Sequence, residues 1–128
     1  MINEVVMDTN VLVSALLTHG PPAAIIDMVA EGKLIPVYND LIISEYWDVL
    51  QRPKFNFHSI QISRLISNIV RAGMAIEVNK PSTVPMTDKD DRIFYDAAKV
   101  SSSFLITGNI KHYPHVSFIV TPSDFLKM

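Results

Sequence analysis

Short runs of β-branched and other apolar residues alternate with segments of helical spacing along almost the whole chain. This alternation restricts the possible folds, because a helix that follows each strand returns the chain to the same end of a parallel sheet. We therefore predict an α/β fold, a three-layer sandwich with helices on both faces of a central five-stranded parallel sheet. The expected strands are residues 2–7, 34–38, 74–78, 104–107 and 118–120, and the expected helices are residues 10–17, 23–30, 40–50, 59–72, 92–101 and a last one from 122.

The size and composition are those of one domain. The chain has 128 residues, 48% of them hydrophobic, and it contains neither a repeat nor a linker-like stretch, so we expect a single domain over residues 1–128. The lack of cysteine excludes disulfides, thiolate metal sites and a cysteine nucleophile. No stretch approaches the roughly 20 apolar residues of a membrane span, and no basic segment opens the chain. We expect a cytoplasmic protein that does not associate with membranes.

The net charge of −2 does not by itself indicate a nucleic-acid-binding protein. Five of the 13 acidic residues, however, fall at the ends of expected elements or on an apolar helix face. If a cation neutralised these five, eight acids would remain against 11 Lys and Arg, and the surface could accept a polyanion. The five are Asp8, Glu45, Asp88, Asp90 and Asp91.

Two of these acids stand at informative positions. Asp8 directly follows the first strand, at the sheet edge where ligands of open parallel sheets bind, although an Asp there could also cap the next helix. Glu45 projects from an apolar stripe that contains Leu41, Ile42 and Val49 on the helical wheel. A buried Glu needs a partner, which could be an Arg or Lys or a bound cation.

The run 88–91 opens the helix at 92–101 with three acids in four residues. Capping and the helix dipole account for one or two of them, but their mutual repulsion calls for a compensating charge. Asp91 lies toward the packed side of the helix. Asp96, by contrast, lies opposite Phe94 and four residues after Arg92, so we expect it to form a solvated ion pair.

The fourth strand ends in Thr107, Gly108 and Asn109, which offer a hydroxyl, backbone amides and a side-chain amide. Together with the acids, these residues would form a cluster of hard oxygen donors at one edge of the sheet. Such donors suit Mg²⁺ or Mn²⁺ better than Zn²⁺. Carboxylate-held hard cations commonly catalyse displacement at phosphorus.

In these residues the sequence resembles the PIN-domain family of metal-dependent ribonucleases, and within it the toxin components of toxin–antitoxin pairs. The resemblance implies the strand order 3-2-1-4-5, hydrolysis of RNA phosphodiester bonds with Mg²⁺ or Mn²⁺, a homodimer, and a small antitoxin as protein partner. It assigns the catalytic metal-binding acids to Asp8, Glu45 and Asp91. The matching segments, in order, are residues 8–10, 44–50, 52–55, 88–94, 104–109 and 121–126.

One position departs from the family pattern. Many PIN domains have an acid where this chain has Asn109, whose amide oxygen can still ligate or orient water but brings no charge. We expect Asn109 to assist catalysis and expect Asn10, Thr107 and Lys111 to contact the substrate. An alternative function is a PIN-like nucleic-acid or partner-binding module with weakened catalysis.

Other interpretations have less support. A phospho-accepting receiver domain would need an acid pair at the end of the first strand and a Lys after the fifth, and the chain has neither. His58, His112 and His115 lack the spacing of a zinc site and are expected in loops or on the surface, where His112 or His115 could hydrogen-bond phosphate. The segment 52–58 mixes cations with Phe55 and Phe57, as single-strand binders do, although such aromatic residues also serve in cores or dimer interfaces.

Overall fold

The computed structural model describes residues 3–128 and contains one five-stranded parallel sheet in the order β3-β2-β1-β4-β5. The predicted fold class and strand order are therefore confirmed. The elements along the chain are β1 (Glu4–Met7), α1 (Thr9–Leu17), α2 (Pro21–Ala30), β2 (Ile35–Tyr38), α3 (Asp40–Leu50), α4 (Ser59–Ala72), β3 (Met74–Ala75), the 3₁₀ turn η1 (Lys89–Asp91), α5 (Arg92–Ser101), β4 (Phe104–Ile106), the 3₁₀ turn η2 (Ile110–His112), β5 (Ile119–Val120) and α6 (Pro122–Leu126).

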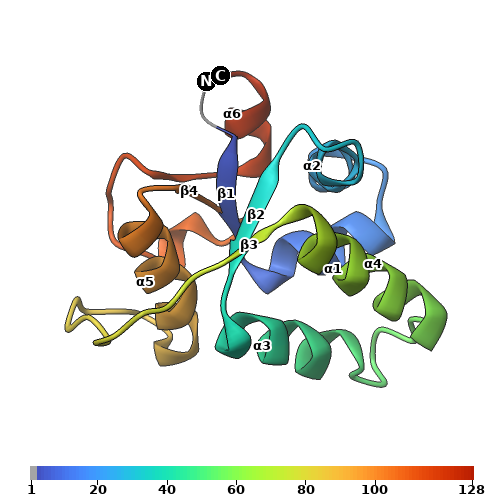
Figure 1. Ribbon diagram of the computed structural model, residues 1–128, viewed down its shortest axis with the longest axis horizontal. Helices are drawn as coiled ribbons and strands as arrows, with labels where there is room; N and C mark the ends of the chain where they lie inside the picture. Colours follow the sequence, from blue (N-terminus) through green and yellow to red (C-terminus); the bar gives the residue numbers. More distant parts are fainter. Residues whose placement is uncertain (1–2) are drawn as a thin grey trace.

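The helices form two layers around the sheet (Figure 1). Helix α5 packs on β1, β2 and β4 from one side, while α1, α2 and α4 lie together on the other side. Helix α3 follows the carboxyl end of β2 and contacts helices of both layers, α1 and α4 on one side and α5 on the other. It therefore lies close to the sheet edge where the carboxyl ends of the strands meet.

The core runs through the two central strands. Val5, Val6 and Met7 of β1 and Leu105 and Ile106 of β4 have no solvent-exposed surface. A strand that is buried on both faces needs apolar residues at successive positions rather than at alternate ones. This explains why the two central strands are continuous apolar runs in the sequence.

The edge strand β3 is shorter than the predicted range 74–78. The backbone amide of Ile76 donates the last hydrogen bond of this pair, to the carbonyl of Tyr38. Strand β2 ends there, because the next residue, Asn39, caps α3 with its side chain on the amide of Ile42. Residues after Ile76 thus have no strand beside them to pair with. Ile2, where the predicted first strand begins, lies outside the described residues.

A close approach between α4 and β2 depends on Gly73. This residue ends α4, and a Cβ built on it would collide with the carbonyl oxygens of Pro36 and Ile69. The side chain of Tyr38 would also lie within 2.9 Å of that Cβ. Only glycine lets the backbone pass β2 at this distance.

The expected solvated ion pair at Asp96 is wrong. Asp96 is buried, and its Oδ2 accepts a hydrogen bond of 3.1 Å from the amide of Ser82. Arg92 donates instead to the carbonyl and hydroxyl of Ser82, at 2.8 and 3.0 Å. The segment between β3 and η1 therefore covers a second face of α5, which the helical wheel had assigned to solvent.

Within residues 3–128, no single helix has the length and apolar composition to cross a membrane, and α1 and α2 meet those criteria only as a pair bent by 102°.

Candidate active site

The structure brings the five acids singled out in the sequence into one pocket of about 350 Å³ at the carboxyl ends of the strands. The pocket wall comes from four separate parts of the chain: the end of β1 with the start of α1, helix α3 with the loop after it, the turn η1 with the start of α5, and the segment after β4. Its lining residues are Asp8, Thr9, Asn10, Val13, Glu45, Val49, Arg52, Lys54, Phe55, Asp88, Asp90, Asp91, Phe94 and Asn109.

Asp8 is held rigidly at the base of this pocket. Only 5% of the residue is exposed, and its Oδ2 accepts hydrogen bonds from the hydroxyls of Tyr113, at 2.7 Å, and Thr107, at 3.0 Å. Its Oδ1 accepts from the amide of Asn10 at 3.3 Å, as an N-cap of α1. Asp8 therefore caps a helix and also presents a carboxylate to the pocket, and the two interpretations of this residue are compatible.

Asn10 and Thr107 join the ends of β1 and β4. Asn10 accepts a hydrogen bond from the amide of Gly108 at 3.0 Å and donates to the Thr107 hydroxyl at 3.4 Å. The amide of Asn109 donates to the same hydroxyl at 3.0 Å. Thr107, which was expected to contact the substrate, is fully buried and is not part of the pocket wall, so its hydroxyl instead positions Asp8 and the strand ends.

Glu45 lies half-buried on α3 and lines the pocket. Burial raises its pKa, and the nearby carboxylates of Asp48 and Asp90 raise it further, while the charge of Arg52 lowers it. Asp48 itself is exposed and pairs with Arg52 at 3.1 Å. The apolar stripe around Glu45 is only partly buried: Ile42 is enclosed, whereas Leu41 is 64% exposed.

Asp91 ends the 3₁₀ turn before α5, and its side chain is 16% exposed. Burial raises the pKa of Asp91 to about 7, and the charges of Asp8 and Asp88 add to this effect. The charge of His112 lowers the pKa of Asp91 and so partly opposes this rise; Nδ1 of His112 lies 3.7 Å from Oδ2 of Asp91. The acids of the pocket therefore repel one another, and no Lys or Arg of residues 3–128 forms an ion pair with Asp8, Glu45 or Asp91.

The donor set fits a hard divalent cation in its chemistry. It consists of carboxylate and amide oxygens. Burial and, after it, the neighbouring carboxylates raise the pKa of Asp91, and a cation would offset the negative charge of those carboxylates. Across the described part of the chain, no three His, Asp or Glu side chains stand close enough to hold one ion together as placed. Binding at this pocket would thus require the carboxylates to draw together.

The predicted site residues differ in their placement. Asp8, Glu45, Asp91, Asn10 and Asn109 all line the pocket. Lys111, which was expected to contact the substrate, lies exposed on η2 and is not part of the pocket wall.

Sequence reasoning missed Tyr113, and it gave no role in this site to His112 beyond a hydrogen bond to phosphate. Both follow β4 in a stretch without strand or helix periodicity. Burial and the charge of Asp8 raise the pKa of Tyr113, so its hydroxyl remains protonated and donates to Asp8. The only available signal was an aromatic hydroxyl shortly after the strand that ends in Thr107.

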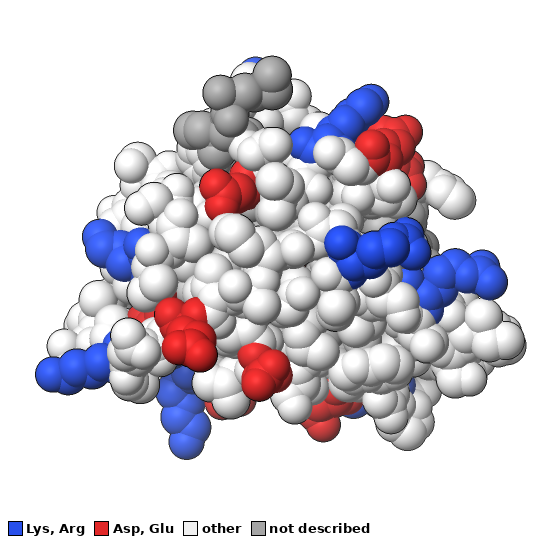
Figure 2. Space-filling model, in the orientation of Figure 1, with Lys and Arg blue, Asp and Glu red and all other residues white. Residues whose placement is uncertain are grey.

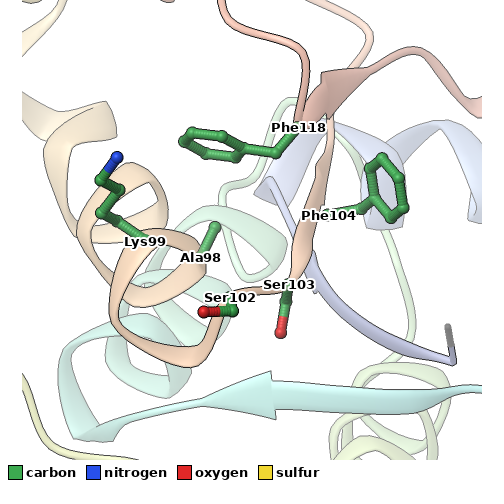
Figure 3. A pocket seen from close by; sticks show the side chains of 6 residues that line it. All are labelled: Ala98, Lys99, Ser102, Ser103, Phe104 and Phe118. Atoms are coloured by element: carbon green, nitrogen blue, oxygen red, sulfur yellow. The ribbon is translucent and has the colours of Figure 1, made fainter.

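A second cavity, of about 370 Å³, lies beside the start of β4 (Figure 3). Lys99 is its one charged residue, and the ammonium of Lys99 lies 5.8 Å from the ring centre of Phe118. With no carboxylate in its wall, this cavity lacks the ligands for a hard cation. Its lining residues are Ala98, Lys99, Ser102, Ser103, Phe104 and Phe118.

Comparison with known proteins relates the chain to a protein family and to a solved structure. A family model described as "PIN domain" matches residues 4–111. Among solved structures, the crystal structure of VapBC2 from Rickettsia felis, bound to a DNA fragment from their promoter, is similar with a TM-score of 0.60 and 14% sequence identity. That likeness covers 92% of this chain and 96% of the other chain. No curated protein sequence matches the chain.

Proposed function

The chain belongs to the PIN-domain family, and on this premise we propose that it is a metal-dependent endoribonuclease that hydrolyses RNA phosphodiester bonds. PIN domains are generally nucleases. The observation that carries the proposal is the pocket of about 350 Å³ at the carboxyl ends of the strands, into which three segments of the chain bring five carboxylates. None of the three acids assigned to catalysis forms an ion pair with a Lys or Arg within residues 3–128.

Asp8, Glu45 and Asp91 would hold Mg²⁺ or Mn²⁺, since hard cations prefer carboxylate oxygens. When bound, such an ion supplies polarisation of the phosphodiester and activation of water. Water would attack the phosphorus as the bond to the 3′ oxygen breaks, which leaves a 5′-phosphate and a 3′-hydroxyl.

The other residues have positioning roles in this proposal. Tyr113 and Thr107 fix the carboxylate of Asp8 through two hydrogen bonds to one oxygen, so its remaining lone pairs stay oriented. Asn109 lies exposed in the pocket wall, where its amide can orient water or a phosphate oxygen. Asn10 keeps the two strand ends together.

We further propose that the protein is the toxin of a toxin–antitoxin pair, with a small antitoxin protein as its partner, and that it forms a homodimer. The order of the PIN-like motifs along the sequence and the fold shared with VapBC2 support this role.

Two observations favour a second candidate, a PIN-like module that binds nucleic acid or a partner with little catalysis. Asn109 contributes no charge to the pocket, and no three acids of residues 3–128 are drawn together around one point. Fewer charges at a site weaken its hold on a divalent cation.

Incubation of the purified protein with single-stranded RNA and Mn²⁺ separates the two. We expect cleavage by the wild type, none after chelation, and loss of cleavage in Asp8→Asn. Asp27→Asn is the matched control, because Asp27 is an exposed acid on α2 outside the pocket. Equal and negligible cleavage by all forms would favour the binding module, and cleavage by Asp8→Asn at the wild-type rate would contradict the assigned site.

A further inference from the structure

The loop between α3 and α4, residues 51–58, places cations beside the acidic pocket. Arg52, Lys54 and Phe55 of this loop line the same pocket as the five carboxylates. The wall is therefore acidic where β1, α3 and η1 contribute and partly basic at the loop. A repulsive field from the acids alone would keep a phosphate chain away, so cations at the rim bear directly on substrate binding.

This loop has a defined conformation. Two successive turn hydrogen bonds, from the amide of Phe55 to the carbonyl of Arg52 and from the amide of Asn56 to the carbonyl of Pro53, fold it back on itself. Asn56 adopts the left-handed region with φ of 54°, which asparagine tolerates better than most residues. Phe55 and Phe57 stack with ring centres 5.5 Å apart and planes 10° from parallel.

The aromatic pair supports Lys54. The ammonium of Lys54 lies 5.1 Å from the ring centre of Phe55, within the range of a cation–π contact. Phe57 in turn packs against the hydrophobic core. Phe55 already contacts both Phe57 and Lys54. Its ring therefore supports the lysine side chain and is not an open surface on which a nucleobase could stack.

The two cations of the loop, Arg52 and Lys54, differ in whether they form an ion pair within the protein. Arg52 is paired with Asp48 at 3.1 Å, and its charge also acts on Glu45. Lys54 forms no ion pair with any carboxylate of the described residues. Figure 2 shows Lys and Arg side chains scattered among acidic and uncharged ones on the face in view, without a broad basic area. With a net charge of −2, attraction of a polyanion must come from local cations.

We propose that Lys54 binds a backbone phosphate of a single-stranded nucleic acid and so positions the strand across the acidic pocket. This inference rests on the proposed nuclease function for its biological meaning, but its test measures binding alone. Lys54 is a positioning residue in this scheme and takes no part in bond cleavage.

The test is equilibrium binding of a fluorescent decamer of uridine by anisotropy, over a series of KCl concentrations. Ca²⁺ replaces Mg²⁺, so that binding is measured with a hard cation present while hydrolysis is slow. Each phosphate contact on a single strand contributes about 0.7 to the slope of log K against log salt. We expect Lys54→Gln to lower the slope by about 0.7 and to weaken binding about 5–10-fold near 50 mM salt.

Two variants serve as controls. Lys54→Arg keeps the charge and should keep the wild-type slope. Lys33→Gln makes the same charge change in the turn between α2 and β2, outside the pocket, where Lys33 pairs with Glu31 at 3.2 Å, and it should bind as the wild type does. A deoxythymidine decamer tells whether the contact needs the ribose. Equal slopes for Lys54→Gln and Lys33→Gln, or no salt-dependent binding by the wild type, would overturn the proposal.

A decamer of glutamate tests the other class of polyanion. If Lys54→Gln weakens its binding as much as that of the oligonucleotide, the site takes acidic peptide and the proposal is wrong. Cleavage assays then separate the two inferences: the variant should raise KM at unchanged kcat. If Lys54→Gln lowers the salt slope but the wild type cleaves no RNA, the nuclease function is rejected and the phosphate contact stands. If the wild type cleaves RNA but Lys54→Gln leaves the salt slope unchanged, the phosphate contact is rejected and the nuclease function stands.

Discussion

The hydroxyl of Tyr113 donates a hydrogen bond of 2.7 Å to Oδ2 of Asp8, across 105 positions of sequence. Both residues are at least 95% buried, and Thr107 donates to the same oxygen. Buried carboxylates need such partners, because an ionised group without them loses its hydration without compensation. This hydrogen bond connects the stretch after β4 to the end of β1. The orientation of the Asp8 carboxylate therefore depends on how these two distant segments pack together.

Removal of this hydroxyl tests its role. Tyr113→Phe leaves Oδ2 of Asp8 with Thr107 alone, and we expect the affinity for Mn²⁺ or the cleavage rate to fall by about 10–100-fold, as for other groups that orient a metal ligand. The free energy of unfolding should fall by about 1.5–3 kcal/mol, since the lost bond is to a charged group. Calorimetric Mn²⁺ titration and urea unfolding measure the two effects. Tyr38→Phe is the matched control, because it removes a hydroxyl bonded to Val70 away from the pocket.

The pH dependence of stability reports on Asp91. Burial and the charges of Asp8 and Asp88 raise its pKa to about 7 from the ordinary value of 3.8. Between these values the folded chain keeps a proton that the unfolded chain has released, so the free energy of unfolding should fall as pH rises through this window. Urea unfolding of metal-free protein at several pH values measures the slope.

Asp91→Asn should flatten that slope and be more stable than the wild type at pH 8 by about 1–3 kcal/mol. This is less than the full pKa difference would give, because the side chain of Asp91 still reaches solvent, which screens part of the effect. Saturating Mn²⁺ should stabilise the wild type more than the variant. An unchanged slope in Asp91→Asn would assign the titration to another group.

Asn109 contributes no charge to the pocket wall, so placing a carboxylate there tests how the charge of the site affects metal binding. Asn109→Asp would place one more carboxylate among the oxygen donors, and we expect about tenfold tighter Mn²⁺ binding, since ligand charge tunes the affinity of such sites. Without metal the same variant should be slightly less stable, because the added charge joins like charges. Thermal unfolding with and without Mn²⁺ measures both effects. Asn79→Asp, an exposed position outside this pocket, should show neither.

The approach of α4 to β2 gives a prediction about the fold alone. Gly73→Ala adds a Cβ that meets backbone oxygens of Pro36 and Ile69, which cannot rotate away as a side chain could. We expect a loss of about 1–3 kcal/mol in the free energy of unfolding, as for other overpacked sites. Gly20→Ala meets no atom closer than 4.0 Å, and as a change at the N-cap of α2 it should cost less than about 1 kcal/mol. Comparable losses in the two variants would mean that the contact at Gly73 is not limiting.

The sequence predicted the layers of this fold well, because apolar periodicity depends on residues close together in the chain. The helix at residues 59–72 agrees with the structure for this reason. It also grouped Asp8, Glu45 and Asp91, since strand ends and helix starts in a parallel sheet meet at one edge.

Contacts made by irregular segments could not be predicted from local periodicity. Tyr113 reaches Asp8 from a stretch that has no periodic pattern, and nothing local marks its partner. Asp96 was assigned to solvent because the helical wheel assumes one buried face for α5. The loop that holds Ser82 covers another face, and its path depends on tertiary contacts rather than on helix spacing.

The two ends of the described chain lie together, on the side of the sheet away from the acidic pocket. Asn3 and Met128 border the same surface hollow, and Figure 1 places α6 beside the start of β1, far from α3. A fluorescent protein or affinity tag fused at either end would thus emerge where it does not obstruct the acids. The same closeness would allow a short linker to join the ends.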